Sequence, residues 1–310
     1  MAQNPVREPG AQDRHIRPLQ YGSPTVRRWT RVSGSALVLG GGGISGVAWE
    51  LGILAGLAEA GVDLTDADLV VGTSAGSIVG TLLATGCDLE HLYTGQLARV
   101  STGEPAARMG TTTLLRWGFA AVTVRNPRRF RVKVGALARA TRTVPEQERK
   151  QVIAARLPVH EWPARRLIVT AVDAVTGEFM PFDRESGVRL VDAVAASCAV
   201  PGVWPPITVG GRQYIDGGVR STANVDLAAG ADRIVVIAPL PRGGGPMPGV
   251  AAQVAHLGDS ATVAVVSPDP ASRHAFGRNV LDPTRRAPAA RAGRAQAAES
   301  AAHIAAIWSA

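Results

Sequence analysis

The chain has 310 residues, of which 46% are hydrophobic, so it is long and apolar enough to bury a sizeable core. Two cysteines, Cys87 and Cys198, are too few for a disulfide framework and give no metal-binding spacing, so a reducing compartment fits best. The net charge of +8 favours an anionic partner, but the aromatic content of only 5% and the absence of nucleic-acid-binding motifs argue against nucleic acid.

Residues 1–34 are rich in Pro, Gln, Gly and Arg, and they contain no apolar signal-peptide core. We expect a disordered basic arm there. No stretch reaches the roughly 18 uninterrupted apolar residues of a spanning helix, and the most apolar stretch is broken by Glu50. With nucleic acid set aside, acidic lipid headgroups are the expected anionic partner. We therefore predict a cytoplasmic protein that contacts a membrane surface peripherally without crossing it.

Residues 35–310 alternate short apolar runs with longer helical patterns, which is typical of an α/β protein with a mostly parallel sheet. The first predicted strand is 35–40, followed by a helix at 46–61 and a second strand at 67–72 that ends in a sharp turn. The strand pattern is then interrupted over residues 87–157. Several predicted helices and the basic cluster VRNPRRFRVKV lie there, so we expect a helical insertion.

The strand pattern returns after the insertion. Further elements are predicted at 165–173, 177–183, 205–218, 232–240, 261–269 and about 285–308, of which the last is an Ala- and Arg-rich helix and the others are strands or hairpins. A Val-Thr-Gly turn joins the first two strands into a hairpin, and a Gly-Gly pair centres a second hairpin. No internal repeat or clear linker interrupts the pattern, so we expect a single domain over residues 35–310.

Four consecutive glycines follow the first predicted strand, in ALVLGGGGISGVAWELGIL. Gly41, Gly43 and Gly46 fit the dinucleotide fingerprint GxGxxG, whereas the bare backbone also fits an oxyanion loop that donates successive N–H groups. A dinucleotide site needs an acidic residue at the end of the second strand. The nearby aspartates precede that strand instead, which disfavours nucleotide binding.

The end of the second predicted strand is GTSAG, which matches the nucleophile-elbow pattern GxSxG with a strand before it and a helix after it. Glycine is expected at Gly72 and Gly76 because a Cβ there would collide with the neighbouring strand and helix. This turn lifts the hydroxyl of Ser74 toward the helix N-terminus, whose partial positive charge favours developing negative charge. Ser74 is therefore the candidate nucleophile.

A serine nucleophile needs a base, and none of the six histidines has a convincing sequence context. The segment YIDGGVRSTAN places Asp216 at the end of a predicted strand, directly before Gly217 and Gly218. Two glycines let the backbone turn sharply away while the acidic side chain faces a site. A hairpin-exit or helix-capping aspartate is the alternative on these residues alone.

In chain order, GGGGISG, GTSAGS, AASCAVPGVWPPI and DGGVRSTAN resemble the patatin-like phospholipase family over roughly residues 35–240. The resemblance implies a three-layer α/β/α fold with a helical cap, and a Ser-Asp dyad that hydrolyses lipid acyl esters through an acyl-enzyme, with no metal and no cofactor. It implies Ser74 as nucleophile and Asp216 as base. The matching loop and motif glycines are Gly41, Gly42 and Gly43 for the oxyanion hole, and Gly46, Gly72, Gly76, Gly217 and Gly218 in support.

Two positions depart from the family pattern. Ser45 stands where the family commonly has Arg or Lys before the last glycine of the loop, so a basic contact to a phosphate is absent from this loop. Asp226 stands where a Pro usually follows the Asn that Asn224 matches, which should alter the local turn more than the chemistry.

Other functions remain open on the sequence. A Ser-His-Asp triad esterase would use a histidine, by chain order His256 or His274. A catalytically silent lipid-binding or interaction protein would keep the same fold, and a nucleotide-binding oxidoreductase is the least favoured.

The segment TTTLLRWGFAAVTVRNPRRF, residues 111–130, runs from an apolar stretch with Trp117 and Phe119 into an arginine cluster. This composition predicts a cap that dips into a lipid interface while its arginines meet anionic headgroups. A helix pair packed on the core, with solvated arginines, is the alternative.

Overall fold

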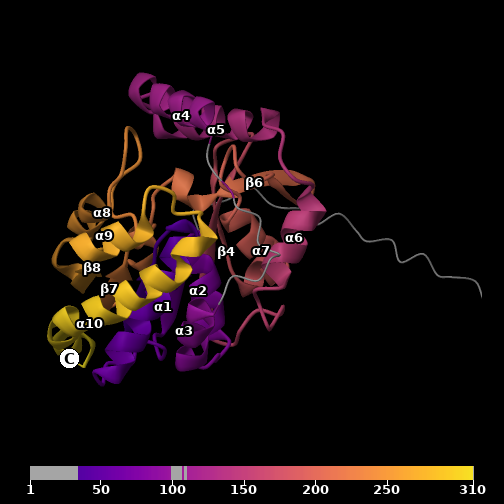
Figure 1. Cartoon of the computed structure of the whole chain (residues 1–310). Coiled ribbons are helices and arrows are strands. Elements are labelled where there is room, and N and C mark those ends of the chain that lie inside the picture. Colours follow the sequence, from indigo (N-terminus) through magenta and orange to yellow (C-terminus); the bar gives the residue numbers. More distant parts are fainter. Residues whose placement is uncertain (1–33, 99–106, 108–109, 310) are drawn as a thin grey trace, which may run out of the picture.

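A computed structural model describes residues 34–98, 107 and 110–309, without the side chains of residues 111–114 and 116. Of the predicted N-terminal arm, only Gly34 lies within the described residues. A central sheet runs through the molecule with helices packed around it (Figure 1).

Within the described residues the sheet has eight strands, in the order β5-β6-β3-β2-β1-β7-β8, with β4 also paired to β3. The parallel strands are β1 (Ser35–Leu39), β2 (Leu69–Gly72), β3 (Arg166–Asp173), β7 (Arg233–Ile237) and β8 (Thr262–Val266). The antiparallel strands are β4 (Phe179–Phe182), β5 (Ile207–Val209) and β6 (Arg212–Asp216). The predicted mostly parallel α/β sheet is confirmed, and both predicted hairpins are present.

Side chains alternate between the two faces of the parallel strands, and both faces are covered. In β1, Leu37 and Leu39 belong to one apolar cluster, whereas Ala36 and Val38 belong to another. The first cluster includes side chains from α1 (Gly43–Glu59), α2 (Ala75–Ala84), α3 (Leu89–Leu97), α6 (Glu146–Ala154), α7 (Leu190–Ser197), α9 (Pro270–Phe276) and α10 (Arg286–Trp308). The second includes side chains from α8 (Val250–Leu257) and the short helix η3 (Val225–Ala228). The arrangement is therefore the expected three-layer α/β/α fold.

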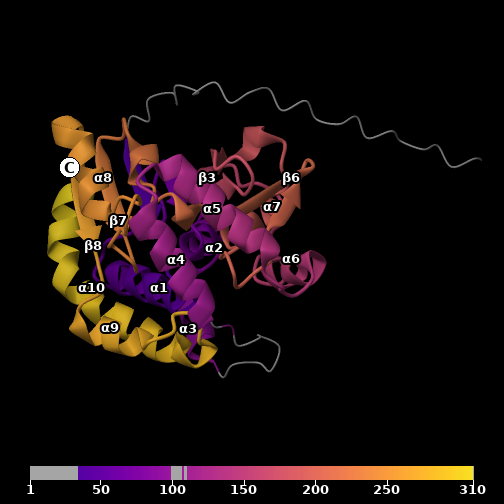
Figure 2. The same cartoon turned by 90° about the horizontal axis from the view of Figure 1, so that it is seen from above.

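The predicted insertion is helical where it is described. Between β2 and β3 lie α3, α4 (Thr111–Thr123), α5 (Pro127–Ala140) and α6. Helices α4 and α5 lie side by side along the top of the molecule in Figure 1, and Figure 2 shows them from above. They form a third apolar cluster with residues at the ends of β3 and β6, including Val172 and Ile215. The insertion therefore covers the edge of the sheet that carries Asp216.

Helix α1 begins at Gly43, three residues earlier than predicted. Glycine has a low helix propensity, so the sequence pattern placed the start after the glycine run. As a result Gly43 is the first residue of the helix, with a φ of 61° that favours glycine. No helix among the described residues is long and apolar enough to cross a membrane.

Candidate active site

Ser74 lies in a sharp turn between β2 and α2. Its φ is 53° and its ψ is −112°, a backbone conformation that costs on the order of 1–3 kcal/mol in a non-glycine residue. A Cβ on Gly72 would lie 2.6 Å from the carbonyl oxygen of Gly76, and one on Gly76 would overlap the carbonyl of Leu39 in β1. These contacts explain why glycine flanks the serine on both sides.

Asp216 ends β6, and its carboxylate lies near Ser74, whose hydroxyl acts to lower the pKa of the Asp216 carboxyl. The backbone N–H of Gly218 donates to the Oδ1 of this carboxylate at 2.7 Å. A Cβ on Gly217 would overlap the hydroxyl of Thr170, so glycine is required where the chain turns away. The structure thus brings together the two side chains that the sequence predicts as nucleophile and base.

The environment of Asp216 shifts its acidity toward that of a general base. Burial raises the pKa of its carboxyl to about 6, and the Ser74 hydroxyl and the N–H of Gly218 oppose this rise by stabilising the charged form. The side chain is 5% exposed. A carboxylate with a pKa of about 6 is largely ionised at pH 7 and remains basic enough to take a proton from a hydroxyl.

The glycine loop after β1 lies beside the serine. A Cβ on Gly41 would lie 3.6 Å from the Cβ of Ser74. The N–H of Gly41 donates to the carbonyl of Thr222 at 2.6 Å, so this group is already engaged. Within the described part of the chain, the N–H groups of Gly42 and Gly43 donate to no partner. Among the three predicted oxyanion donors, these two are the better placed.

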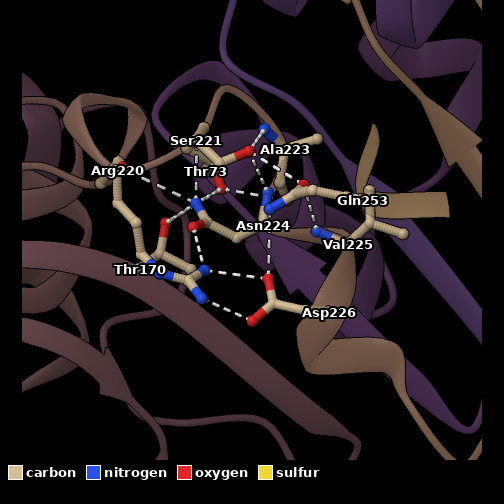
Figure 3. Close-up of polar contacts among 10 residues, drawn as sticks. Thr73, Thr170, Arg220, Ser221, Ala223, Asn224, Val225, Asp226 and Gln253 are labelled. Atoms are coloured by element: carbon tan, nitrogen blue, oxygen red, sulfur yellow. Dashed lines mark hydrogen bonds and ion pairs between the residues drawn. The ribbon is translucent and has the colours of Figure 1, made fainter. Parts of the chain in front are cut away.

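A buried polar network centred on Asn224 connects the two turns (Figure 3). Its amide nitrogen donates to the hydroxyl of Thr73 at 3.0 Å, to that of Thr170 at 3.4 Å and to the carbonyl of Gly217 at 3.5 Å. Thr73 precedes the serine and Gly217 follows the aspartate. Asn224 is fully buried in a left-handed conformation, with φ at 55°. This side chain therefore ties the turn that carries Ser74 to the turn that carries Asp216.

Asp226, which stands where the family pattern has proline, belongs to the same network. Arg220 donates to the Oδ1 of Asn224 at 2.7 Å and forms an ion pair with Asp226 (Figure 3). The guanidinium carbon of Arg220 also lies 4.1 Å from the ring centroid of Phe179. Gln253 on α8 accepts a hydrogen bond from Ser221 and donates to Asp226. The ion pair and this glutamine fix the turn that a proline would otherwise stiffen.

A narrow pocket of about 30 Å³ opens beside Ser74, which is room for about one water molecule. Its wall is mostly apolar and comes from α1, α2 and the segments after α7 and α9, namely Ile44, Val47, Ile78, Val200, Trp204 and Leu281. Arg149 on α6 and Arg156 just after it complete the wall.

The other candidate groups lie outside this pocket or are chemically inert. The five histidines within the described residues are all exposed, and His256 and His274 line no part of the pocket. The buried Cys198 contacts the carbonyl of Ser74, but burial raises the pKa of its thiol to about 11, so it stays protonated. The described residues contain no group of His, Cys, Asp and Glu that could hold a metal ion.

Sequence reasoning missed several residues around the site. Thr73 and Thr170 gave no signal, because threonine is ordinary in apolar strands. Arg149 lies in EQERKQ, which reads as a solvated helix face, yet its side chain is 4% exposed. Ser197, whose hydroxyl accepts the N–H of Ser74 at 2.9 Å, follows a run of alanines. Only Asn224 carried a hint, through its place after the Asp-Gly-Gly segment.

Comparison with known proteins assigns this chain to a family. A family model described as patatin-like phospholipase matches residues 37–229. Two similar solved structures are VipD from Legionella pneumophila, with 14% sequence identity and a TM-score of 0.43, and the type III effector protein ExoU, with 17% and 0.41. The matches cover 89% and 88% of this chain, and 67% and 53% of those chains respectively. This chain therefore spans about two thirds of one structure and about half of the other.

Proposed function

The chain belongs to the patatin-like phospholipase family, and we propose that it hydrolyses lipid acyl esters with Ser74 as nucleophile and Asp216 as general base. The observation that supports this proposal is the position of Ser74, in its strained turn, near a buried carboxylate whose pKa is about 6. No histidine is needed, because the carboxylate alone can accept the hydroxyl proton.

In the first half of the reaction, the Asp216 carboxylate takes the proton of Ser74 while the serine oxygen attacks the ester carbonyl carbon. The negative charge that develops on the carbonyl oxygen is stabilised by the N–H groups of Gly42 and Gly43. The tetrahedral intermediate then collapses. The alcohol leaves with the proton held by Asp216, and the acyl group remains esterified to Ser74.

In the second half, Asp216 takes a proton from water, whose oxygen attacks the acyl-serine ester. Collapse of the second tetrahedral intermediate releases the fatty acid and returns the proton to Ser74. The network around Asn224 supports both halves, since it holds the two turns that carry the reacting groups in one arrangement.

Fluorophosphonate labelling tests this function directly. Wild-type protein should be labelled on Ser74, and Ser74→Ala should lose both labelling and ester hydrolysis. Asp216→Asn should lower hydrolysis by several orders of magnitude, because the serine keeps its place but has no base. His256→Ala and His274→Ala should remain active. Loss of activity in either histidine variant would favour a triad, and a wild type that is never labelled would favour a silent lipid-binding protein.

We also propose that α4 contacts an anionic membrane. Leu115, Phe119 and Val122 are 73%, 63% and 83% exposed, and their spacing of four and three residues aligns them on one helix face. Three large exposed apolar side chains in one stripe mark an interaction surface rather than a solvated face.

The basic residues beside this stripe divide into two groups. Arg131 and Arg128 are engaged by the turn between β3 and β4, because their Nε atoms donate to the carbonyls of Gly177 and Thr176. Arg125, Arg129 and Lys133 are exposed, and the ammonium of Lys133 lies 5.1 Å from the ring centroid of Phe119. Among the described side chains of α4 and α5, we infer that these three cations, rather than Arg128 and Arg131, are available to lipid headgroups.

Vesicle binding tests the membrane contact. Serine at Leu115, Phe119 and Val122 together should lower partition onto phosphatidylglycerol vesicles by about tenfold or more, because the apolar area available for burial is lost. Val265→Ser is the matched control, since Val265 is 44% exposed on β8, at the opposite edge of the sheet from β6. Unchanged vesicle binding of the triple variant would end the proposal.

A further inference from the structure

Glu50 interrupts the most apolar stretch of the sequence, and the structure places it inside the core. It lies in the second turn of α1 and is 0% exposed. Neither of its carboxyl oxygens has a hydrogen-bond partner among the described residues. A buried polar group without such a partner lowers the stability of a fold. The carboxyl group at this position therefore calls for an explanation other than stability.

The position of Glu50 on α1 directs its side chain toward the glycine loop. Gly42, Gly46 and Glu50 are spaced by four residues, and the N–H of Gly46 donates to the carbonyl of Gly42 at 2.9 Å. The three positions therefore lie on one face of the helix. Long side chains on a helix point back toward its N-terminus. Because Gly46 has no side chain, the Glu50 side chain can extend along this face toward the loop.

The carboxyl group of Glu50 lies beside the backbone of Gly40, at the start of the loop. Burial raises the pKa of this carboxyl well above its usual value, and the backbone of Gly40 acts to lower it, which places the two groups close together. Burial thus favours the neutral acid. A neutral acid suits this place, because a negative charge here would oppose the oxyanion that the neighbouring N–H groups stabilise.

Gly40 connects the glycine loop to the turn that carries Ser74. Its N–H donates to the carbonyl of Ile237 in β7 at 2.9 Å, and its carbonyl accepts the N–H of Gly76 in α2 at 2.9 Å. A displacement of Gly40 therefore moves the loop relative to the turn of the serine. Small misplacements of this kind are costly for catalysis, because the oxyanion donors must meet the reacting carbonyl at a fixed distance.

We propose that Glu50 is a positioning residue for ester hydrolysis, which as a neutral acid supports Gly40 from inside the core and so aligns the loop N–H groups with Ser74. This inference rests on the proposed acyl hydrolysis and deepens it by adding a residue that touches neither the substrate nor the reacting atoms. It also explains why a carboxyl group stands where an apolar side chain would stabilise the fold.

Two substitutions of similar length separate the polar group from the space that it fills. Glu50→Gln keeps a neutral polar group, so the rate of fluorophosphonate labelling should stay within about threefold of wild type. Glu50→Met fills the same space without that group. It should lower the labelling rate, and kcat for a water-soluble ester, by about 10- to 100-fold, as expected for a displaced oxyanion loop. The KM of this variant should stay within about twofold of wild type.

Thermal unfolding distinguishes positioning from a purely structural role. Glu50→Met should melt at or above the wild-type temperature, because an apolar side chain replaces a buried carboxyl group without a hydrogen-bond partner. Glu50→Gln should also be at least as stable as wild type at pH 7, because the raised pKa makes the wild-type carboxyl take up a proton on folding, whereas an amide does not. Leu57→Ala is the matched control, since Leu57 is fully buried seven residues further along α1. It should lower the melting temperature and leave the labelling rate of the folded protein unchanged.

Labelling of Glu50→Met at the wild-type rate, or equal losses in Glu50→Gln and Glu50→Met, would overturn the proposal. Hydrogen exchange of the loop backbone separates its failure from failure of the proposed function. Glu50→Met should speed amide exchange in residues 40–46 by about tenfold, because the loop opens more often without the support of the carboxyl group. If wild type shows no fluorophosphonate labelling, hydrolysis is refuted while this measurement still tests the support of the loop. Unchanged exchange in Glu50→Met would overturn the role of Glu50 even if wild type hydrolyses esters.

Discussion

The pH dependence of ester hydrolysis tests the role of Asp216 most directly. Burial raises the pKa of its carboxyl to about 6, and a general base must be deprotonated to act. The value of kcat/KM should therefore rise with pH and reach half its plateau near pH 6. For a single titrating group, about 9% of the base form remains at pH 5 and about 90% is present at pH 7. We expect an approximately tenfold fall in rate between these two values.

The same shift predicts a change in stability. Because the folded-state pKa lies above the ordinary value of 3.8, the native protein binds this proton more tightly than the unfolded chain. The stabilisation is complete below pH 3.8 and is lost as the pH rises through about 6. A shift from 3.8 to about 6, at about 1.4 kcal/mol per unit, corresponds to about 3 kcal/mol. Asp216→Asn should therefore be inactive yet more stable than wild type at pH 7, by up to that amount.

Asp173 is a control for Asp216, because its carboxyl pKa is shifted in the opposite direction. Burial acts to raise the pKa of its carboxyl, but hydrogen bonds from Thr176, Val175 and Arg212 outweigh burial and lower it. Its stabilisation is therefore present above the ordinary value of 3.8 and is lost as the pH falls through the lowered folded-state pKa, so Asp173→Asn should weaken the fold at pH 7.

The assay is kcat/KM for a water-soluble ester from pH 4.5 to 8.5, together with denaturant unfolding of each variant at pH 5 and pH 7. Asp173→Asn should keep the acidic limb near pH 6. A rate that is flat between pH 5 and 7 in wild type would refute the assignment of Asp216 as base, as would wild-type activity in Asp216→Asn.

Three further predictions concern the structure around the site. Gly76→Ala should unfold or aggregate the protein, because its methyl group would overlap a backbone carbonyl of β1. Gly95→Ala is the control: Gly95 lies in α3 with open space around it, so this variant should raise the melting temperature slightly. Asn224→Ala should lower the stability of the fold by about 1–3 kcal/mol and slow fluorophosphonate labelling, because buried donors and acceptors lose their partner. Asp226→Asn changes a partly exposed ion pair, so thermal unfolding should show a loss of less than about 1 kcal/mol. Cys198 should resist iodoacetamide at pH 8 in peptide mapping, because burial raises the pKa of its thiol to about 11.

The order of strands and helices could be predicted because each element carries its own local pattern. The apolar runs before the glycine loop and before GTSAG are short and end at glycines, which favours buried strands, and the Gly-Gly pair marks a hairpin. The start of α1 was placed too late because glycine opposes helix formation in general. Here the tight contacts of Gly42 and Gly43 with Pro239 and Val280 require glycine and outweigh that preference.

The candidate nucleophile and the candidate base could be chosen from the sequence for a related reason. Each lies next to glycines that a sharp turn requires, so the sequence marks the turn even where it cannot mark the chemistry. That Gly41 would already donate to Thr222 could not be read in advance, because Thr222 comes from a loop far along the chain. The local pattern thus located the glycine loop. Only the tertiary structure shows that the N–H of Gly41 already has an acceptor, whereas those of Gly42 and Gly43 have none among the described residues.

Arginine shows where sequence reasoning ends. The cluster from Arg125 to Lys133 looks uniformly basic, yet Arg131 is turned toward the carbonyl of Gly177 while Arg129 is exposed. Arg149, in an acidic and basic helix of ordinary composition, is buried and lines the pocket beside Ser74. The role of a charged side chain depends on what the fold packs against it, and one of the side chains packed against Arg149 is Trp204, more than fifty residues away in the chain.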